Sequence, residues 1–274
     1  MNILLLYISP NKTTEKISYA LRDRFIQDGH KVTTLNIGNQ TNRNPQNLSP
    51  QIFDEVDLIG IGSPAYHMRI LEPMENFLSI ALPRLKKPVK AFIYLAFGGI
   101  TTGKAFLNTS KILKQHAISI VGGMKVWAPH FYNHVSYPDP SALKTIDLFC
   151  SRLSENQFQS IPWEKVKQMF SYQTWQVNAV YPLTHWIGKL RQLPIRIDHN
   201  KCIKCKRCVN ECPTGAMEMG ETVIHNSQKC IYCYHCTTVC SRQAILCPTE
   251  KVEDMLRINK KIIGCEQPKN AVFL

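Results

Sequence analysis

Eight of the eleven cysteines stand in two runs that share one spacing. The first run follows the pattern CxxCxxCxxxCP, and the second repeats it with Ser241 in place of the proline. This spacing lets three thiolates of one tight loop ligate three irons of a cubane, while the fourth cysteine points away and ligates the other cluster. The pattern therefore predicts two 4Fe–4S clusters. The predicted ligands are Cys202, Cys205, Cys208 and Cys240 for one cluster, and Cys230, Cys233, Cys236 and Cys212 for the other.

Two other interpretations of these cysteines are a pair of zinc sites and a disulfide framework. Zinc sites usually pair two CxxC units across a longer loop and need no third cysteine at the next three-residue step. Disulfide cysteines would be scattered along the chain, whereas short regular spacing indicates metal and a reducing compartment. We expect surface or packing roles for His225 and His235, because the cysteines already complete the ligand set. The pattern assigns no role to the remaining cysteines, Cys150, Cys247 and Cys265.

The cysteine runs belong to an internal repeat, 199–219 and 227–247, in which all four cysteines superimpose. Ala216 and Ala244 stand at equivalent positions, where a small side chain allows close approach. On these motifs, residues 199–247 resemble a bacterial-type two-cluster ferredoxin. The resemblance implies electron transfer in one-electron steps.

A second candidate site lies near the N-terminus, where a Ser/Thr-rich turn follows an apolar run and opens a helical pattern. Hydroxyls and backbone N–H groups at a helix N-terminus bind a phosphate dianion. Neither GxGxxG nor GxxxxGK(S/T) is present, so a single phosphate fits better than a dinucleotide or a nucleoside triphosphate. A simple helix cap is the alternative, because Ser and Thr cap helices widely. The candidate phosphate-binding residues are Ser9, Asn11, Lys12, Thr13 and Thr14.

Two further loops also follow apolar runs that read as strands, so they are expected near the phosphate turn. The second loop, residues 62–68 (GSPAYHM), offers the Tyr66 ring for stacking. The third loop, residues 96–104 (AFGGITTGK), offers glycines whose N–H groups can approach a planar ligand. The alternatives are a core aromatic and an ordinary glycine turn. With the phosphate turn, these loops resemble the FMN site of flavodoxins, a family that usually carries glycines where Pro10 and Lys12 stand. The resemblance implies FMN contacts from Ser63, Pro64, Ala65, Tyr66, His67, Ala96, Phe97, Gly98, Gly99 and Gly103, with Trp127, His130 and Tyr132 bordering the pocket.

Strand and helix patterns alternate over the first half of the chain and position these loops. Apolar runs predict buried strands, and helical periodicity predicts helices between them. The alternation implies right-handed crossovers and a parallel sheet covered on both faces. With the resemblance, the fold class is α/β, a flavodoxin-like doubly wound five-stranded parallel sheet that binds its ligand at the carboxyl ends of the strands. The expected strands are 2–8, 31–37, 56–62, 89–96 and 118–126, and the expected helices are 13–27, 72–81 and 102–115.

The order of these parts resembles the flavodoxin and ferredoxin fusion proteins of anaerobic bacteria and archaea. Between the two parts, aromatic and basic residues broken by prolines predict helices joined by turns. The aromatic rings are expected to pack one domain on the other, and the alternative is a docking surface or a substrate wall. These aromatic residues are Trp163, Phe170, Tyr172, Trp175, Tyr181 and Trp186. A short basic helix over 252–261 and a tail are expected at the end. The expected domains are 1–138, flavodoxin-like and FMN-binding; 139–197, a helical connector; 198–250, an α+β two-cluster ferredoxin-like domain; and 251–274, a helix and tail.

The composition favours a soluble, cytoplasmic protein. No apolar run approaches the roughly 18 to 20 residues that span a bilayer. The first residues, MNILLLYISP, have neither the basic leader nor the cleavage site of a secretion signal, so a buried strand explains them better. The formal charge of +13 is spread over both halves of the chain. Two clusters with their thiolates would add a charge of about −4 and a flavin phosphate about −2, which lowers the net positive charge. We therefore expect no nucleic-acid partner.

The predicted function is electron transfer between FMN and two 4Fe–4S clusters, which couples one-electron and two-electron steps. The alternative is a flavin-dependent oxidoreductase that reduces its own small substrate with electrons from the clusters. A cluster-bearing sensor that binds nucleic acid is a third class, supported only by the net charge. A redox partner protein is expected. Basic residues surround the first cysteine run, which favours either an acidic partner or simply a solvated basic face. These residues are Lys189, Arg191, Arg196, Lys201, Lys204, Lys206 and Arg207.

Overall fold

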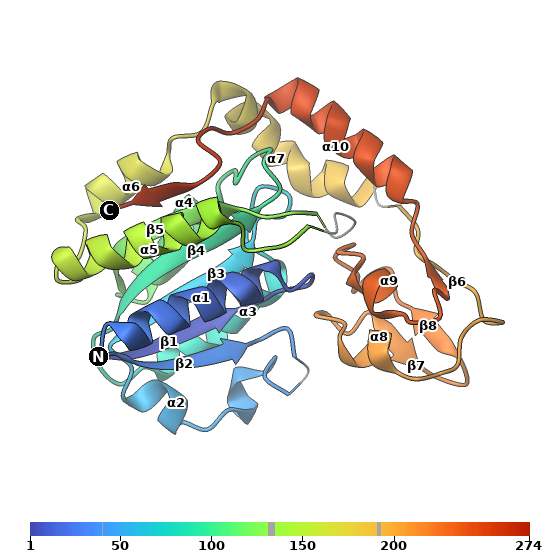
Figure 1. Ribbon diagram of the computed structural model, residues 1–274, viewed down its shortest axis with the longest axis horizontal. Coiled ribbons are helices and arrows are strands. Elements are labelled where there is room, and N and C mark those ends of the chain that lie inside the picture. The colour runs from blue at the N-terminus through green and yellow to red at the C-terminus, as the bar shows by residue number, and fades with distance from the viewer. Residues whose placement is uncertain (40, 131–134, 191–192) are drawn as a thin grey trace.

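The computed structural model (Figure 1) describes residues 1–39, 41–130, 135–190 and 193–274. Its centre is a six-stranded sheet in the order β10-β5-β4-β3-β1-β2. Strands β1 to β5 run parallel, and their order, β2-β1-β3-β4-β5, is that of a flavodoxin-like sheet. The expected α/β fold class is therefore confirmed. The strands are β1 (Asn2–Tyr7), β2 (Lys31–Asn36), β3 (Leu58–Pro64), β4 (Lys90–Phe97), β5 (Ser119–Trp127) and β10 (Ala271–Phe273).

Five helices cover the two faces of this sheet: α1 (Thr13–Gln27), α3 (Glu72–Ala81), α4 (Ala105–Gln115), α5 (Pro140–Glu155) and α6 (Trp163–Phe170). Helices α1 and α5 share one core with the sheet, which contains Leu21, Phe92 and Phe149. Helices α3, α4 and α6 share the other core, which contains Phe77 and Phe170. The middle strands are buried on both sides, so they carry nearly continuous apolar runs. Shorter elements are the 3-10 turns η1 (Pro45–Asn47) and η2 (Leu82–Arg84) and helix α2 (Gln51–Asp54).

The sheet domain continues beyond residue 138, where the connector was expected to follow. Helix α5 begins there, and the Asp139 side chain caps it by accepting a hydrogen bond of 2.7 Å from the N–H of Ala142. Its apolar face is buried on the sheet. In α6, Phe170 stacks on Phe106 with 4.8 Å between ring centroids. An aromatic residue that was expected to join two domains thus completes the core of the first. The sequence did not show this, because the helical period of these residues is hidden among basic residues and prolines.

The last residues form an edge strand rather than the expected tail, so the sheet has six strands instead of five. In β10, Val272 pairs with Met124 of β5 in antiparallel register. Phe273 stacks on Tyr172 with 5.2 Å between ring centroids. The strand covers backbone groups that β5 would otherwise expose at the edge of the sheet. Three residues are too few to reveal a strand by alternation, which explains why the pattern did not predict β10.

Two helices join the sheet domain to the C-terminal domain and lie side by side (Figure 1). Helix α7 (Trp175–Leu190) leads toward the cysteine-rich segment, and α10 (Thr249–Ile263) leads back to β10. The expected basic helix over 252–261 lies within α10. Over the described ranges, no helix combines the length and the apolar character that crossing a bilayer requires.

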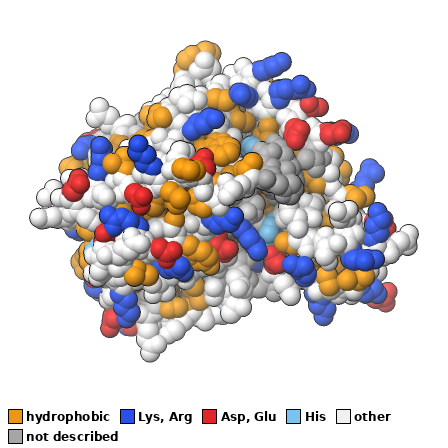
Figure 2. Space-filling model, in the orientation of Figure 1, with side chains coloured by type: hydrophobic (Ala, Val, Ile, Leu, Met, Phe, Trp, Pro, Cys, Tyr) orange, Lys and Arg blue, Asp and Glu red, His pale blue; other side chains and the backbone are white. Residues whose placement is uncertain are grey.

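The cysteine-rich domain is small and has two short antiparallel strand pairs, β6 with β9 and β7 with β8. Its core contains Met217, Val223 and Ile245 together with several of the cysteines. Figure 2 shows Lys and Arg side chains around the rim of this domain. Its elements are β6 (Arg196–Ile197), α8 (Arg207–Asn210), β7 (Met217–Met219), β8 (Val223–His225), α9 (His235–Val239) and β9 (Ile245–Leu246).

Candidate functional site

Two cavities in the C-terminal domain are each lined by four cysteines. Each cavity takes three cysteines from one run and the last cysteine from the other run. Apolar side chains complete the lining, such as Val223 in the first cavity and Met217 in the second. This arrangement fits two cubanes that exchange their fourth ligand. The first cavity is lined by Cys202, Cys205, Cys208 and Cys240, the outer cysteine set, and the second by Cys230, Cys233, Cys236 and Cys212, the inner cysteine set.

The two cysteine runs have the same backbone conformation as well as the same spacing. Lys204 and Lys206 have φ angles of 54° and 62°, and their equivalents Tyr232 and Tyr234 have φ angles of 51° and 55°. Non-glycine residues adopt this left-handed conformation rarely, so its repetition marks a shared, tightly curved loop. Each loop bends its three cysteines around one cavity.

In each run, a backbone N–H group donates to the sulfur of the fourth cysteine, which belongs to the set formed mainly by the other run. The N–H of Ala216 lies 3.2 Å from Sγ of Cys212, and the N–H of Ala244 lies 3.2 Å from Sγ of Cys240. The small side chains of the two alanines allow this approach. Hydrogen bonds to cluster sulfurs stabilise negative charge and are among the factors that set reduction potential.

Burial keeps several of these thiols protonated in the protein without metal. It raises the pKa of Cys208 to about 11 and that of Cys233 to about 12. Iron binds thiolates, so loading of the site at neutral pH must release protons. Among the described residues, no three Cys, His, Asp or Glu side chains converge as ligands of a single metal ion. The cysteine sets fit clusters in which each thiolate ligates its own iron.

The turn after β1 contains a buried hydroxyl without a partner. Oγ1 of Thr14 makes no hydrogen bond to the described residues, although Thr14 is fully buried. Ser9 is already used as a helix cap, because its Oγ accepts a hydrogen bond of 3.0 Å from the N–H of Glu15. Lys12 has φ 64°, a glycine-like conformation at a position where the resemblance expects glycine. A phosphate oxygen would supply the acceptor that Thr14 lacks, so the turn fits the phosphate of FMN.

The second loop, after β3, folds back through a hydrogen-bonded pair, Tyr66 and Arg69, at 2.9 Å in both directions. The Ser63 hydroxyl is buried and hydrogen-bonds within the loop, so it serves the loop conformation. His67 is exposed and has φ 48°. Tyr66 is half-buried and Ala65 packs beside it against the sheet core.

Backbone hydrogen bonds join the second loop to the third. The N–H of Ala65 donates to the carbonyl of Ala96 at 2.8 Å, and that of Lys104 donates to the carbonyl of Met68 at 2.9 Å. Gly103 has φ 57°, and a Cβ there would lie 2.1 Å from Cβ of Met68. The residue must therefore be glycine for the two loops to meet. The structure thus brings the second and third candidate flavin loops together at the carboxyl ends of β3 and β4.

Two residues of the third loop face the rings that were expected to border the pocket. A Cβ on Gly98 would lie 2.2 Å from Cε1 of His130, and a Cβ on Gly99 would lie 3.2 Å from Cδ1 of Trp127. Both rings therefore pack directly on the glycine backbone. Tyr132 lies outside the described residues, and so does the side chain of Trp186 in the expected connector.

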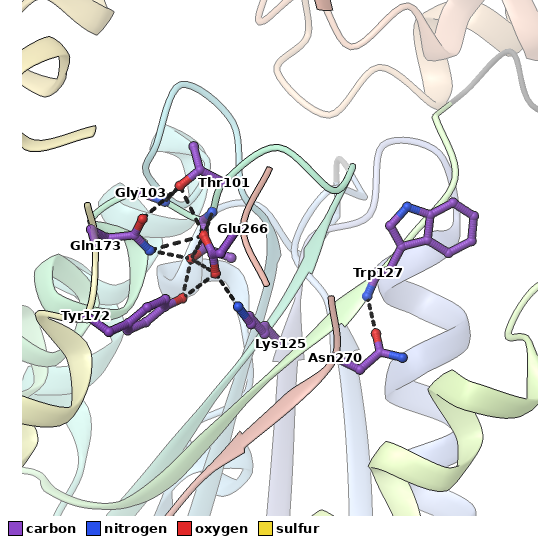
Figure 3. A network of polar contacts seen from close by, with 9 residues as sticks. Thr101, Gly103, Lys125, Trp127, Tyr172, Gln173, Glu266 and Asn270 are labelled. Atoms are coloured by element: carbon purple, nitrogen blue, oxygen red, sulfur yellow. Dashed lines mark hydrogen bonds and ion pairs between the residues drawn. The ribbon is translucent and has the colours of Figure 1, made fainter. Parts of the chain in front are cut away.

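A buried carboxylate from the C-terminal segment holds the third loop (Figure 3). Glu266 accepts hydrogen bonds from Nζ of Lys125, from the Tyr172 hydroxyl and from the N–H of Thr102. Burial raises the pKa of Glu266, but the hydrogen bonds from Lys125 and Tyr172 outweigh it, so the pKa lies below its ordinary value. The ionised carboxylate thereby fixes the loop that begins at the end of β4.

The second cysteine run lies near two of the candidate flavin loops. Ile231, within the second cysteine run, packs against the same core cluster as Tyr66. The pKa of Tyr66 is raised by burial and also by the charge of Cys233. Burial lowers the pKa of His235, and the charge of Lys12 in the phosphate turn lowers it further. The second cysteine run therefore lies within electrostatic reach of two candidate flavin loops.

The pattern missed three charged residues that contact these sites, namely Arg43, Lys125 and Glu266. Lys125 had a signal, because it interrupts the apolar run of β5 and is only 1% exposed. A charge inside a buried run indicates a buried partner. The two others carry no local signal. His235 does have a packing role, as expected, with Nε2 at 3.0 Å from Oε2 of Glu211.

Comparison with known proteins supports this architecture. Residues 194–241 match the 4Fe-4S dicluster domain family. Over 98 residues the chain is 30% identical to a probable iron-sulfur protein of the frd operon of Proteus vulgaris, a match that covers 28% of this chain and 62% of that protein. An uncharacterized ferredoxin of Methanocaldococcus jannaschii is 36% identical over 61 residues, which are 21% of this chain and 42% of that protein. The chain thus spans less than two thirds of these relatives.

The sheet domain is similar to solved flavodoxin structures. A flavodoxin from the domain Archaea has 13% sequence identity and a TM-score of 0.45, over 57% of this chain and 98% of that chain. The two-electron reduced flavodoxin of Megasphaera elsdenii has 15% identity and a TM-score of 0.40, over 53% of this chain and 96% of that chain. The strand order and the dicluster match together agree with a flavodoxin and ferredoxin fusion.

Proposed function

We propose that this chain, which joins a flavodoxin-like sheet domain to a 4Fe–4S dicluster domain, transfers electrons between FMN and two 4Fe–4S clusters in the cytoplasm. FMN exchanges electrons singly or in pairs and each cluster exchanges one at a time. None of the eleven cysteines, all of which lie within the described residues, forms a disulfide, which agrees with a reducing compartment. The outer and inner cysteine sets would hold the clusters. The FMN would be held by Ser9, Asn11, Lys12, Thr13, Thr14, Ser63, Pro64, Ala65, Tyr66, His67, Ala96, Phe97, Gly98, Gly99 and Gly103.

The observation that carries the proposal is the proximity of the second cysteine run to the candidate flavin loops. Ile231 and Tyr66 pack on one core cluster, and Cys233 acts on the pKa of Tyr66. Short separation between redox groups within one chain favours electron transfer between them. The three loops at the carboxyl ends of the strands would bind and orient the flavin. The buried side chains around Cys233 would keep water away from the space between the flavin and the inner cluster.

The outer cysteine set supports entry of electrons from a partner protein. Cys205 is exposed, whereas Cys233 is buried. Lys204, Lys206 and Arg207 are exposed and lie next to Cys205 in the sequence. This charge would attract an acidic redox protein and raise its association rate at low ionic strength. The partner would therefore meet the set of cysteines that lies away from the flavin loops.

The test is anaerobic electron transfer within the purified chain. Clusters are reconstituted and reduced in flavin-free protein, excess reductant is removed, and FMN is added in a stopped-flow instrument. Two reduced clusters supply two electrons, which is the number that one FMN accepts, so we expect the flavin absorption to bleach as the cluster absorption recovers. Riboflavin, which lacks the phosphate, should react much more slowly. Bound FMN that stays oxidised beside reduced clusters would refute the proposal.

The partner surface is tested separately with a small acidic ferredoxin as electron donor. The rate of cluster reduction should fall as salt rises, because screening weakens attraction between exposed charges. The triple variant Lys204→Gln, Lys206→Gln and Arg207→Gln should lower the low-salt rate and remove most of the salt dependence. Lys111→Gln, an exposed position on α4, is the control. Equal salt dependence in all three proteins would exclude this surface.

A further inference from the structure

One arginine of the sheet domain reaches into the dicluster domain. Nη2 of Arg43, in the segment after β2, donates a hydrogen bond of 2.6 Å to the backbone carbonyl of Cys212. The same nitrogen lies 3.5 Å from the carbonyl of Gly38 in its own segment. Gly38 also lies beside Pro213, since a Cβ there would be 3.7 Å from Cβ of Pro213. The segment around Arg43 therefore packs on the residues that follow α8 and carry Cys212.

Arg43 is a half-buried cation without a carboxylate partner among the described residues. No Asp or Glu oxygen in the described part of the chain lies within 4.0 Å of it; the salt bridges involve other arginines and lysines. Its Nε is buried and has no hydrogen-bond acceptor among the described residues. A buried charge is costly unless an opposite charge compensates it. The residues nearest to the guanidinium belong to the segment that carries Cys212, whose carbonyl accepts its hydrogen bond, so a cluster held by Cys212 would bring negative charge to this side.

The internal repeat carries glycine at the position that Arg43 approaches and a larger side chain at the equivalent position. Gly215 has φ 69°, and a Cβ there would lie 2.9 Å from Nη1 of Arg43. The equivalent residue of the second repeat is Gln243, which has φ 50° and lies near the outer set. The same left-handed conformation thus accepts a side chain at position 243. Glycine at 215 is favoured by the backbone conformation, and the nearby guanidinium leaves little room for a side chain there.

We propose that Arg43 raises the reduction potential of the cluster held by the inner cysteine set. The inference rests on the two-cluster part of the proposed function and does not require the flavin. Reduction adds one electron from a one-electron donor, breaks no bond, and makes the cluster with its four thiolates more negative by one charge. A fixed positive charge in a medium of low polarity stabilises the more negative state. Arg43 would thereby make the inner cluster easier to reduce than it would be without this charge.

The experiment is a redox titration of the full-length reconstituted protein with dithionite, followed by electron paramagnetic resonance. The outer cluster serves as a control inside each sample. For Arg43→Gln we expect the equilibrium constant for reduction of the inner cluster to fall about tenfold, which is about 59 mV for a one-electron couple. The potential of the outer cluster should stay unchanged. Arg43→Lys should retain most of the wild-type potential, because it keeps the charge.

Arg84→Gln is the matched control. Arg84 also donates to backbone carbonyls, those of Pro45 and Leu48, but within the sheet domain. Its loss should change neither potential. Gly215→Ala is a second probe, because it displaces the guanidinium without removing it, and it should lower the potential of the inner cluster by less than Arg43→Gln does. If Arg43→Gln loads less iron than the wild type, the inner-cluster potentials of Arg43→Lys and Gly215→Ala decide whether Arg43 has this role.

Equal inner-cluster potentials in the wild type, Arg43→Gln and Gly215→Ala would overturn the inference. A parallel shift of both clusters would overturn it as well, since that would indicate a general change in the domain. The titration is carried out on flavin-free protein. Failure to bind FMN would therefore count against the proposed function while leaving the role of Arg43 to be judged by the cluster potentials.

Discussion

Nζ of Lys125 in β5 lies 2.5 Å from Oε1 of Glu266 in the segment before β10, and the two side chains are only 1% and 7% exposed. The pair joins the edge of the parallel sheet to the C-terminal segment. Through Thr102, the same carboxylate holds the loop that follows β4. One buried ion pair thus links the last strand of the sheet to a candidate flavin loop.

Removal of the carboxylate should strongly destabilise the chain. Glu266→Gln leaves the Lys125 ammonium buried without a counter-ion, and loss of one partner of a buried pair typically costs about 3 to 5 kcal/mol. Adding Lys125→Met should recover much of this loss, because no buried charge then remains. Urea unfolding followed by circular dichroism measures both. The exposed pair Lys167 and Glu164 provides the control, since Glu164→Gln should change stability by less than about 0.5 kcal/mol.

The stability that Glu266 contributes should depend on pH with a defined sign. Its pKa in the folded chain lies below the ordinary value of 4.5, so the unfolded chain binds the proton first as pH falls. The contribution is fully present above about pH 4.5 and is lost as pH drops through the folded-state pKa. The difference in unfolding free energy between the wild type and Glu266→Gln should therefore be constant near neutral pH and shrink in acid. A difference that grows below pH 4.5 would contradict this assignment.

Thr14→Val separates phosphate binding from helix capping. The hydroxyl of Thr14 is buried and unpaired in the flavin-free chain, so its removal should leave the stability of that form unchanged or increased. If the hydroxyl binds the FMN phosphate, a charge-assisted hydrogen bond worth about 1.5 to 3 kcal/mol is lost. The Kd for FMN, measured by quenching of flavin fluorescence, should then rise about tenfold to a hundredfold.

Thr109→Val is the matched control for that measurement. Thr109 is equally buried, in α4, but its hydroxyl donates to the carbonyl of Ala105 at 2.8 Å. This substitution should lower stability slightly and leave FMN affinity unchanged. The same Kd in Thr14→Val and the wild type would assign the turn to helix capping alone.

Each cysteine run supplies its fourth cysteine to the cluster of the other run, so substitution of that cysteine should affect the other run's cluster. Cys240→Ser should perturb the same cluster as Cys205→Ser, although it lies in the other run, and Cys212→Ser should perturb the same cluster as Cys233→Ser. Electron paramagnetic resonance spectra of the reduced variants measure this. Cys247→Ser is the control and should retain both signals. Spectra of Cys240→Ser that match those of Cys233→Ser would mean that each run holds its own cluster.

Local patterns predicted most of the sheet and the cysteine motif. Helices α1 and α3 begin and end where periodicity expected them, at Thr13–Gln27 and Glu72–Ala81. The strands agree within one or two residues, because each is a short apolar run bounded by polar residues. In these segments the residues that decide the structure are neighbours in sequence, and the burial they require is visible in their spacing.

Contacts between distant segments could not be predicted in this way. Strand β10 is defined by its pairing with β5, and Arg43 acquires its role only when Cys212 is folded beside it. Phe149 looked like part of a connector because nothing in its neighbourhood indicates the sheet on which it packs. Tertiary packing decides such positions, whereas propensity and period describe only the local chain.

The central claim is that one chain binds both kinds of redox group, and quantification of iron, sulfide and flavin on one anaerobically purified sample tests it most directly. The account predicts about eight irons, about eight sulfides and one FMN per chain. Eight irons with no flavin, even after FMN is added, would contradict it and leave the sheet domain as a docking module for a two-cluster ferredoxin.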